Sequence, residues 1–564
     1  MRKYIFVIIL VLACASHAFA GATVVIVNAD GPGEGFNDPT PAAPVGGNPG
    51  TTLGQQRLIA FAYAADIWGA TLDSNQTIFV QAAFNPLAPN VLGSAGATFV
   101  FRDFGGDGLY PGAEFPATWY GSALADKRAG ADLNPGFADI AAQFSSNFTF
   151  YLGLDANHGP LNDLVTVLLH EFAHGLNFQN FVNEANGANF GVSPTAPDGF
   201  TDIYARHTLD TTTGLFWNEM TQAQRAASAI RFGRVVWDGI NVSTGVPNVL
   251  SFGSPELRIL SPGAIAGTYQ FGTAAYGPAI TSLPSPISRP VVLAVDDANP
   301  SGPSVNDGCT PLTNAPAMFG NIALVERGTC GFVVKSKVAQ DAGAVGVIIM
   351  NNLANATAAP PGMAGVDPTV IVPTVSVTFA DGNIIKGALP GVTASIGKDV
   401  TILAGADALG RARLFMPNPV QGGSSGSHYD SIAFRNLLME PAINPDLTHS
   451  VKAPEDLTLE LLRDVGWFAD ADLDGKADEL DCHPTSDFSA TVVIGGTDTG
   501  IANVMFDNGC TISDLIRNIG ADADNHGEFA SGVAHLGNAL RDAGIISADQ
   551  KGTLQSTAAQ ANIP

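Results

Sequence analysis

Two histidines and a glutamate stand at a spacing that favours metal-assisted hydrolysis. They form the segment His170-Glu171-Phe172-Ala173-His174, inside an apolar stretch, residues 161–178, that predicts a helix. Positions i and i+4 of a helix lie on one face, so both histidines can bind one metal ion. Glu171 projects beside them and can take a proton from water and later deliver it to a leaving amine. The alternative, a helix with two unrelated surface histidines, is rare by chance for an H-E-x-x-H segment.

A catalytic zinc ion needs a third protein ligand, which the segment itself does not supply. The glycine and histidine that would extend the motif at positions 177 and 180 are replaced by Asn177 and Asn180. Asn177 can still form the turn that ends the helix, because asparagine tolerates the left-handed conformation. Asn180 is not a credible zinc ligand. The third ligand must therefore come from elsewhere in the chain, and Asp202, His207 and His428 are the candidates.

Residues 166–178 and 424–468 resemble the two halves of a leishmanolysin-type metzincin site. In that family the third histidine follows a long insertion and precedes a methionine-containing turn beneath the metal. The resemblance implies that His428 is the third zinc ligand and that Met439 forms an apolar floor. Without the resemblance, His428 could be an ordinary loop histidine and Met439 an ordinary core residue. The chain departs from the family at Tyr429, where tryptophan is usual, which changes no ligand but bears on the substrate pocket.

Residues 319–352 closely resemble a protease-associated (PA) domain. The pattern is a strand, a turn with Cys330, a helix that leads into Ala-Gly-Ala, and a strand ending in Asn-Asn, and residues 371–377 fit the family's next strand. An insertion over residues 260–402 would separate His174 from the third ligand, and surface insertions of this kind are tolerated. The module carries no evident catalytic residue, so we expect it to shape substrate access or bind partners, with an inert spacer as the alternative.

Four cysteines remain after residue 20. An even number in an exported protein suggests two disulfides, although sequence alone permits three connectivities. The simplest pairing joins Cys309 to Cys330 and Cys482 to Cys510.

Residues 470–482 are rich in aspartate and predict a second metal site. Oxygen ligands fall at loop positions 1, 3, 5, 9 and 12, and Gly475 occupies position 6, where a calcium loop turns sharply. The segment resembles a thrombospondin type 3 or dockerin-like calcium loop. The resemblance implies Ca²⁺ as a second cofactor, and the alternative is a solvated acidic linker. The aspartates concerned are Asp470, Asp472, Asp474, Asp478 and Asp481.

Residues 1–20 read as a secretory signal peptide. A charged start, an apolar run over residues 5–13 and Ala18-Phe19-Ala20 place the cleavage site before Gly21. A lipoprotein anchored through Cys14 is the alternative. No later stretch is long and apolar enough to span a membrane. The net charge of −26 argues against nucleic acid as a partner.

These patterns together predict an α+β protein whose metzincin-like catalytic domain is split by a β-rich PA insertion and followed by a small helical module. Helices are expected over residues 54–69, 161–178, 333–343 and 456–465, and strands over 22–28, 77–84, 97–104 and 138–151. The domain boundaries are expected at 21–259 and 403–469 for the two catalytic parts, 260–402 for the insertion, 470–482 for the acidic loop and 483–564 for the terminal module.

The predicted activity is that of a secreted zinc endopeptidase that acts on proteins or peptides, with Glu171 as general base. An inactive scaffold that binds partners through the PA domain and terminal module is the first alternative, and a zinc hydrolase of a non-peptide amide is the second. The intact Glu171 favours an enzyme, because an inactive scaffold has no chemical need for it. Side-chain preference and oligomeric state are not encoded in these motifs.

Overall fold

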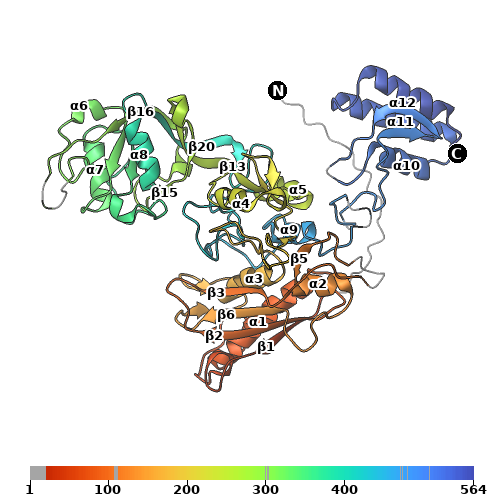
Figure 1. The fold of residues 1–564 in the computed structure, drawn as a ribbon, viewed down its shortest axis with the longest axis horizontal. Coiled ribbons are helices and arrows are strands. Elements are labelled where there is room, and N and C mark those ends of the chain that lie inside the picture. Colours follow the sequence, from red (N-terminus) through yellow and green to blue (C-terminus); the bar gives the residue numbers. More distant parts are fainter. Residues whose placement is uncertain are drawn as a thin grey trace.

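The structure is a computed structural model that describes residues 21–106, 112–298, 300, 304–470, 472, 474–478, 480–506 and 508–563. The predicted signal peptide, residues 1–20, lies outside the described residues, and so does Cys14. Three bodies are visible: a central one, a second one built from the middle of the chain, and a third one at the C-terminal end (Figure 1). Among the described helices, none is long and apolar enough to cross a membrane.

The central body is built from two distant parts of the chain. Its core takes buried side chains from Ala22 to Leu250 and again from Ala406 to Ala477. A four-stranded sheet lies at its base, in the order β1 (Val24–Asn28), β2 (Ile78–Asn85), β6 (Ile140–Ser145), β3 (Gly93–Ala97). Three of these strands are parallel, and β3 runs antiparallel to β6 as an edge strand.

Two helices pack on this sheet, as Figure 1 shows. They are α1 (Leu53–Gly69) and α3 (Leu164–Gly175). The ring of Phe61 from α1 packs against those of Phe144 on β6 and Phe172 on α3, at centroid distances of 4.9 and 6.0 Å. Every residue of α3 is buried, which explains why its sequence is apolar apart from Thr166, His170, Glu171 and His174.

A side-chain cap begins α3, and the turn expected at Asn177 ends it. The side chain of Asp163 caps the first turn by accepting a hydrogen bond from the Thr166 N–H at 3.0 Å. At the other end Asn177 adopts the left-handed conformation, with φ 84°. The Phe178 N–H then donates to the carbonyl of Ala173 at 2.9 Å, which closes the helix end.

The remaining elements of the central body are short and lie between the sheet and the other two bodies. Trp237 and Asn241 both donate hydrogen bonds of 2.8 Å to the buried carboxylate of Asp464 at the end of α9, which joins the two parts of the chain. These elements are β4 (Val100–Phe101), β5 (Thr118–Gly121), α2 (Ser122–Ala129), β7 (Phe150–Tyr151), β8 (Asn162–Asp163), β9 (Thr201–Asp202), β10 (Thr208–Asp210), β11 (Leu215–Phe216), α4 (Gln222–Ser228), β12 (Val235–Trp237), α5 (Ile240–Val249) and α9 (Thr458–Asp464).

The second body contains an eight-stranded sheet in the order β14-β13-β20-β16-β17-β18-β19-β15. Two separate hydrophobic cores cover its two faces, and neither takes a residue from the core of the central body. The expected disulfide between Cys309 and Cys330 is present, with Cα atoms 5.8 Å apart. The elements are β13 (Phe252–Ser261), β14 (Gly267–Tyr269), β15 (Gly272–Thr273), β16 (Ile287–Leu293), α6 (Ala315–Met318), β17 (Ile322–Glu326), α7 (Phe332–Asp341), β18 (Gly346–Met350), β19 (Thr374–Val377), α8 (Phe379–Gly387) and β20 (Thr393–Leu403).

The third body differs from the expected helical module because it also contains a hairpin. The strands β21 (Thr491–Ile494) and β22 (Thr497–Ala502) pair and bury Val492, Ile494 and Ile501 against the helices. The helices are α10 (Ile512–Asp522), α11 (His526–Asp542) and α12 (Ala548–Gln560). Alternating apolar residues in a short run give only a weak strand signal beside three strong helical patterns.

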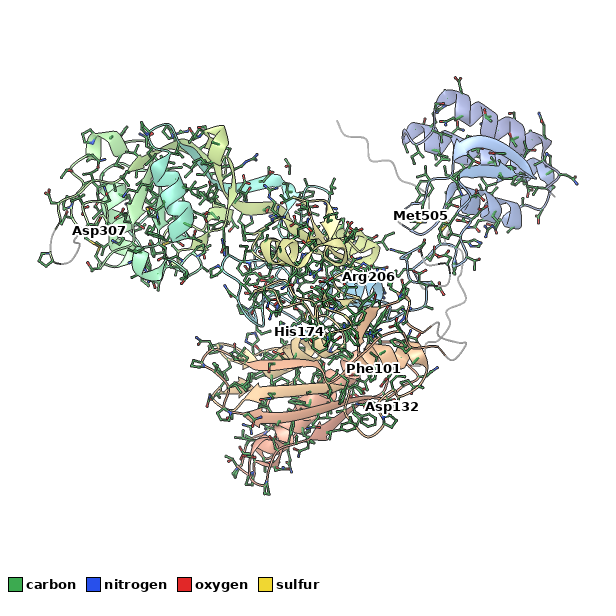
Figure 2. The ribbon with its side chains drawn as sticks, in the orientation of Figure 1. Phe101, Asp132, His174, Arg206, Asp307 and Met505 are labelled. Atoms are coloured by element: carbon green, nitrogen blue, oxygen red, sulfur yellow. A yellow bond between two sulfur atoms is a disulfide. The ribbon has the colours of Figure 1, made fainter. Side chains whose placement is uncertain are left out.

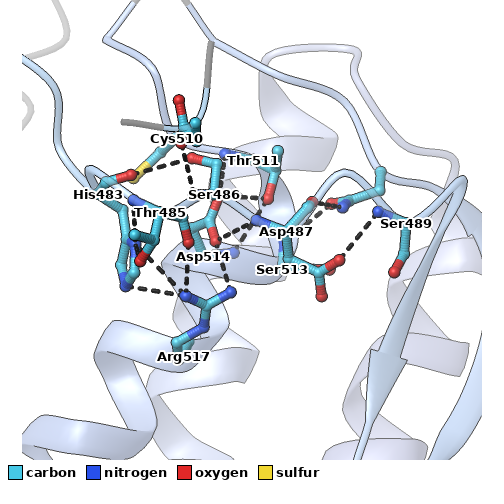
Figure 3. A network of polar contacts seen from close by, with 12 residues as sticks. His483, Thr485, Ser486, Asp487, Ser489, Cys510, Thr511, Ser513, Asp514 and Arg517 are labelled. Carbon is cyan, nitrogen blue, oxygen red and sulfur yellow. Dashed lines mark hydrogen bonds and ion pairs between the residues drawn. The ribbon is translucent and has the colours of Figure 1, made fainter. Parts of the chain in front are cut away.

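A disulfide and a polar network join the third body to the acidic loop. Cys482 pairs with Cys510, as expected, with Cα atoms 5.5 Å apart. Asp514 accepts hydrogen bonds from the N–H groups of Asp487 at 3.0 Å and Thr511 at 2.8 Å, and pairs with Arg517 at 3.0 Å (Figure 3). The base of the module is therefore fixed to the segment that follows the loop.

Excising the second body should leave the central body folded. Pro255 on β13 and Lys398 on β20 face each other in register, so an Asn-Gly turn can join them in place of residues 256–397. Because the cores are separate, we expect the unfolding free energy of the central body to change by about 1 kcal/mol or less. Amide exchange along α3 in the shortened and full chains measures this. Loss of protection throughout α3 would show that the second body is part of the same folding unit.

Candidate metal centre

Three buried imidazoles converge at the C-terminal half of α3. The Nε2 atoms of His170 and His174 lie 3.2 Å apart, and those of His170 and His428 lie 3.3 Å apart. One ligand atom from each ring fits within 4.8 Å of the others. The rings are 4–8% exposed. His174 lies between the sheet and the upper part of the central body (Figure 2).

Each ring is oriented by a main-chain carbonyl at its other nitrogen. Nδ1 of His170 lies 2.7 Å from the carbonyl oxygen of Leu438, that of His174 lies 2.8 Å from Phe178, and that of His428 lies 2.8 Å from Ser424. Because a carbonyl only accepts, Nδ1 must carry the proton in all three rings. The lone pair is then on Nε2, and all three lone pairs face the shared space, as metal ligation requires.

Burial sets the protonation of these rings. It lowers the pKa of His170 to about 4 and that of His174 to about 3, and it lowers the pKa of His428 well below its ordinary value. Each neighbouring ring lowers the pKa of His428 further, through charge repulsion. The histidines are therefore neutral at neutral pH, which is the form that binds a metal ion.

Glu171 lies in the same pocket, between His170 and the edge strand β3. Burial raises the pKa of its carboxyl to about 8, and a hydrogen bond from the Ala95 backbone acts in the opposite direction. A metal cation nearby would favour the carboxylate, because opposite charges attract. Glu171 belongs to none of the hydrogen-bonded histidine pairs, which leaves it available to act on water.

The two rival ligands lie outside this cluster. His207 stacks on Trp237 at a centroid distance of 5.0 Å, and burial lowers its pKa to about 4. Asp202 accepts hydrogen bonds from the N–H groups of Phe181 at 2.9 Å and Ala205 at 2.7 Å. Both side chains therefore stabilise the fold next to the site.

Met439 and Tyr429 follow His428 in the chain, and both are fully buried. The Tyr429 N–H donates to the carbonyl of Met439 at 2.8 Å, and the Tyr429 ring packs edge-on against Phe178 at 5.1 Å. The preceding residue, Leu438, supplies the carbonyl that orients His170, and its own N–H donates to Asp456 at 2.6 Å. The residue before Met439 thus fixes the orientation of a histidine on α3.

An open cleft of about 840 Å³ surrounds the cluster. It is lined by residues 90–95, Phe148, residues 179–184, Phe190 and residues 422–425, 427 and 428 of a Gly-rich segment, among others. Ser145 N–H donates to the Leu92 carbonyl and Thr98 N–H to the Asp139 carbonyl. Since hydrogen-bonded pairs alternate along an antiparallel ladder, the backbone groups of Gly93, Ala95 and Ala97 face away from β6.

Sequence reasoning missed the residues that brace the His428 turn. Asn180, considered there only as a non-ligand, donates its Nδ2 to the Ser427 hydroxyl at 2.9 Å and to the Glu184 carboxylate at 3.0 Å. The Asn180 N–H also donates to the Ser427 hydroxyl at 3.2 Å. No signal in the sequence pairs Asn180 with Ser427, because they are 247 residues apart.

Three aspartates of the acidic loop form a compact group. Asp470, Asp472 and Asp474 can each place a carboxylate oxygen within 4.8 Å of the other two. Asp478 and Asp481 are not in that group, and Asp481 accepts a hydrogen bond from the His483 N–H at 2.9 Å. Gly475 makes the expected sharp turn, with φ 90°. Calcium binding by this loop stays a prediction.

Residues 289–385 match the PA domain family, so the second body contains a PA domain. Similar segments occur in two curated proteins, both described as ER degradation-enhancing alpha-mannosidase-like protein 3. The human protein is 45% identical over 47 residues, 8% of this chain and 5% of that protein. The Xenopus laevis protein is 36% identical over 88 residues, 14% of this chain and 10% of that protein. The chain therefore spans a small fraction of these relatives.

Similar solved structures include several peptidases. A zinc aminopeptidase from Bacillus subtilis is 22% identical, with a TM-score of 0.19 over 28% of this chain and 36% of that chain. A subtilisin-like protease from an Antarctic Pseudoalteromonas is 22% identical, with a TM-score of 0.20 over 26% and 34%. A peptidase M28 precursor from Shewanella amazonensis is 14% identical, with a TM-score of 0.17 over 35% and 45%.

Replacing His428 with alanine should remove the metal, because two ligands from α3 alone leave half of a tetrahedral site open. We expect zinc content, measured by atomic absorption on purified protein, to fall from about one per chain to near zero. His207→Ala should retain zinc, since His207 stacks on Trp237, and so should His535→Ala, since His535 is exposed on α11. The opposite result would make His207 the third ligand. In that case His207→Ala would lose zinc while keeping its fold by circular dichroism, and His428→Ala would retain zinc.

Proposed function

We propose that this protein is a secreted zinc endopeptidase with a split, metzincin-like catalytic domain. The observation that carries the proposal is the convergence of three neutral, buried imidazoles beside Glu171 in an open cleft. The third of these comes from a distant segment and is followed by a buried methionine turn, which is the order of parts in leishmanolysin-type enzymes.

The residues present fit a zinc ion. His170, His174 and His428 would hold it through Nε2, and three imidazole nitrogens with one open position are a donor set typical of catalytic zinc. When bound there, zinc supplies Lewis-acid polarisation of a carbonyl and lowers the pKa of water.

Glu171 would move the proton. Its carboxylate, held by the Ala95 N–H, accepts a proton from the attacking water and later donates it to the departing amine nitrogen. The proton balance closes within one turnover, because the same carboxylate oxygen accepts and returns one proton.

The edge strand β3 supports an extended peptide as the substrate. The N–H and carbonyl groups of Gly93 and Ala97 point away from β6, toward the side on which another strand would add to the sheet in β-strand addition. Such pairing runs along the whole strand and needs no chain terminus. The cleft is also lined by residues from many separate parts of the chain, between Asn90 and Ile443. These features favour cleavage inside a chain over removal of terminal residues.

The wider protein fits an extracellular protease. Both disulfides join segments within or beside a single body, which suits an oxidising compartment. The PA domain is tethered through β13 and β20, and we infer that it controls which proteins reach the cleft. The alternative, an inactive scaffold, has to leave Glu171 and its Ala95 contact unexplained.

Glu171→Gln should abolish proteolysis while zinc stays bound, because the amide keeps the shape of the side chain but cannot accept a proton. We expect the rate on casein to fall by about 10³-fold or more. Zinc content and melting temperature should match those of the native protein. A matched control is Glu219→Gln, an exposed glutamate beside β11, which should retain activity. Full activity in Glu171→Gln would contradict the mechanism.

Peptides blocked at both ends test the endopeptidase assignment. Because strand pairing needs no terminus, we expect an N-acetylated, C-amidated peptide library to be cut at internal bonds, with cleavage lost on adding a zinc chelator. Mass spectrometry of the products identifies the bonds. Release of single residues from free N-termini, with blocked peptides intact, would instead indicate an aminopeptidase.

A further inference from the structure

One carboxylate in the cleft has no part in the chemistry proposed above. Among the described residues that line the cleft, Glu171 and Glu184 are the only acidic ones, and no lysine or arginine is present. None of the ion pairs among the described residues involves Glu184. The carboxylate is half-buried, so its negative charge faces the cleft without a cationic partner from the described residues.

Glu184 is held in place from two sides. Its Oε1 accepts a hydrogen bond of 3.0 Å from Asn180 Nδ2, and Asn180 is in turn bonded to Ser427, next to His428. A Cβ atom on Gly426 would lie 3.4 Å from the same oxygen. The carboxylate therefore lies in the cleft lining, against the turn that carries the third histidine.

The backbone around Glu184 forms a tight turn. Asn183 N–H donates to the Ala188 carbonyl at 2.8 Å, and Gly187 N–H donates to the Asn183 carbonyl at 2.6 Å. Arg225 fixes the turn from behind by donating to the Gly187 carbonyl at 2.8 Å. A Cβ atom on Gly187 would lie 1.9 Å from the carbonyl oxygen of Gln222, so the turn is packed directly on α4. A charged group on a preorganised turn can bind a ligand at a low entropic cost.

We propose that Glu184 is a specificity residue that binds a cationic group of the substrate on the His428 side of the cleft. This inference rests on the proposed function, because it assigns a substrate preference to the same cleft. The cation is an ammonium or guanidinium group, which forms charge-assisted hydrogen bonds with a carboxylate. A lysine or arginine side chain and a free peptide N-terminus both carry such a group.

The surroundings of Glu184 favour a positive ligand over a neutral one. Burial is the main cause that raises the pKa of its carboxyl, and the negative charge of Asp202 adds to this. A bound cation offsets both effects by supplying the missing opposite charge. The alternative is that Glu184 only braces Asn180 and the His428 turn. A bracing role predicts equal losses for basic and neutral substrates, whereas a binding role predicts a loss confined to basic ones.

Peptide binding to the zinc-loaded Glu171→Gln variant tests the proposal without depending on catalysis. The probes are two fluorescein-labelled, terminally blocked library pools that differ only in arginine or glutamine at each varied position. We expect tighter binding of the arginine pool by about tenfold, and loss of that difference in Glu171→Gln/Glu184→Gln. The variant Glu171→Gln/Glu184→Asp should retain part of the preference for the arginine pool, because the negative charge is kept. Glu171→Gln/Asp66→Asn, which removes an exposed charge on α1, is the matched control and should retain all of it.

A third pool with free N-termini and no basic residues distinguishes the two sources of the cation. Tighter binding of this pool that depends on Glu184 would identify the α-ammonium group as the ligand. Equal binding of all pools to Glu171→Gln, or equal weakening of all pools by Glu184→Gln, would overturn the proposal. Casein digestion by the native protein tests the proposed function separately, so a failure of either is distinguishable from a failure of the other.

Discussion

The structure depends on holding three buried imidazoles with their Nε2 atoms facing one small shared space. No unpaired positive charge is tolerated there, so the rings must be neutral, and each needs a fixed acceptor for its Nδ1 proton. Main-chain carbonyls supply all three acceptors. A carbonyl cannot titrate or rotate away from its backbone, so the orientation of each ring follows from the path of the chain. Much of the packing in the central body holds the backbone segments that carry those three carbonyls.

The most demanding of these contacts joins α3 to a segment far along the chain. His428 is 258 residues from His170, and Leu438, which orients His170, is 268 residues away. Other buried polar contacts tie the same parts together: Trp467 donates to the carbonyl of Leu176 at 2.7 Å, and Asp464 receives Trp237. Each of these groups would cost free energy if buried without its partner. The PA domain can occupy the intervening sequence because it has its own cores and leaves through two paired strands.

Much of this arrangement is predictable from local sequence. The helices α1 and α3 carry long apolar patterns, and the turn at Asn177 follows from the tolerance of asparagine for a positive φ. The choice of His428 over His207 came from a family resemblance, and only the fold separates the two, by stacking His207 on Trp237 outside the three-histidine cluster. The strand expected at residues 97–104 is reduced to β4, and the run at 138–151 is divided into β6 and β7. No sequence pattern pointed to Glu184, because its proposed role depends on the cleft around it, and only the folded chain forms that cleft.

The edge strand β3 shows why one element escaped prediction. Its sequence, Gly-Ser-Ala-Gly-Ala, has low β-propensity, so local preference opposes the structure. The residues of β3 are small because other side chains lie very close to the strand. A Cβ atom on Gly93 would lie 3.0 Å from the Glu171 carboxylate, and one on Gly96 would lie 2.9 Å from the Gln179 side chain. The strand must approach α3 closely for the Ala95 N–H to reach Glu171. Pairing with β6 offsets the weak propensity, and the bare backbone that results is the surface best suited to pair with a peptide.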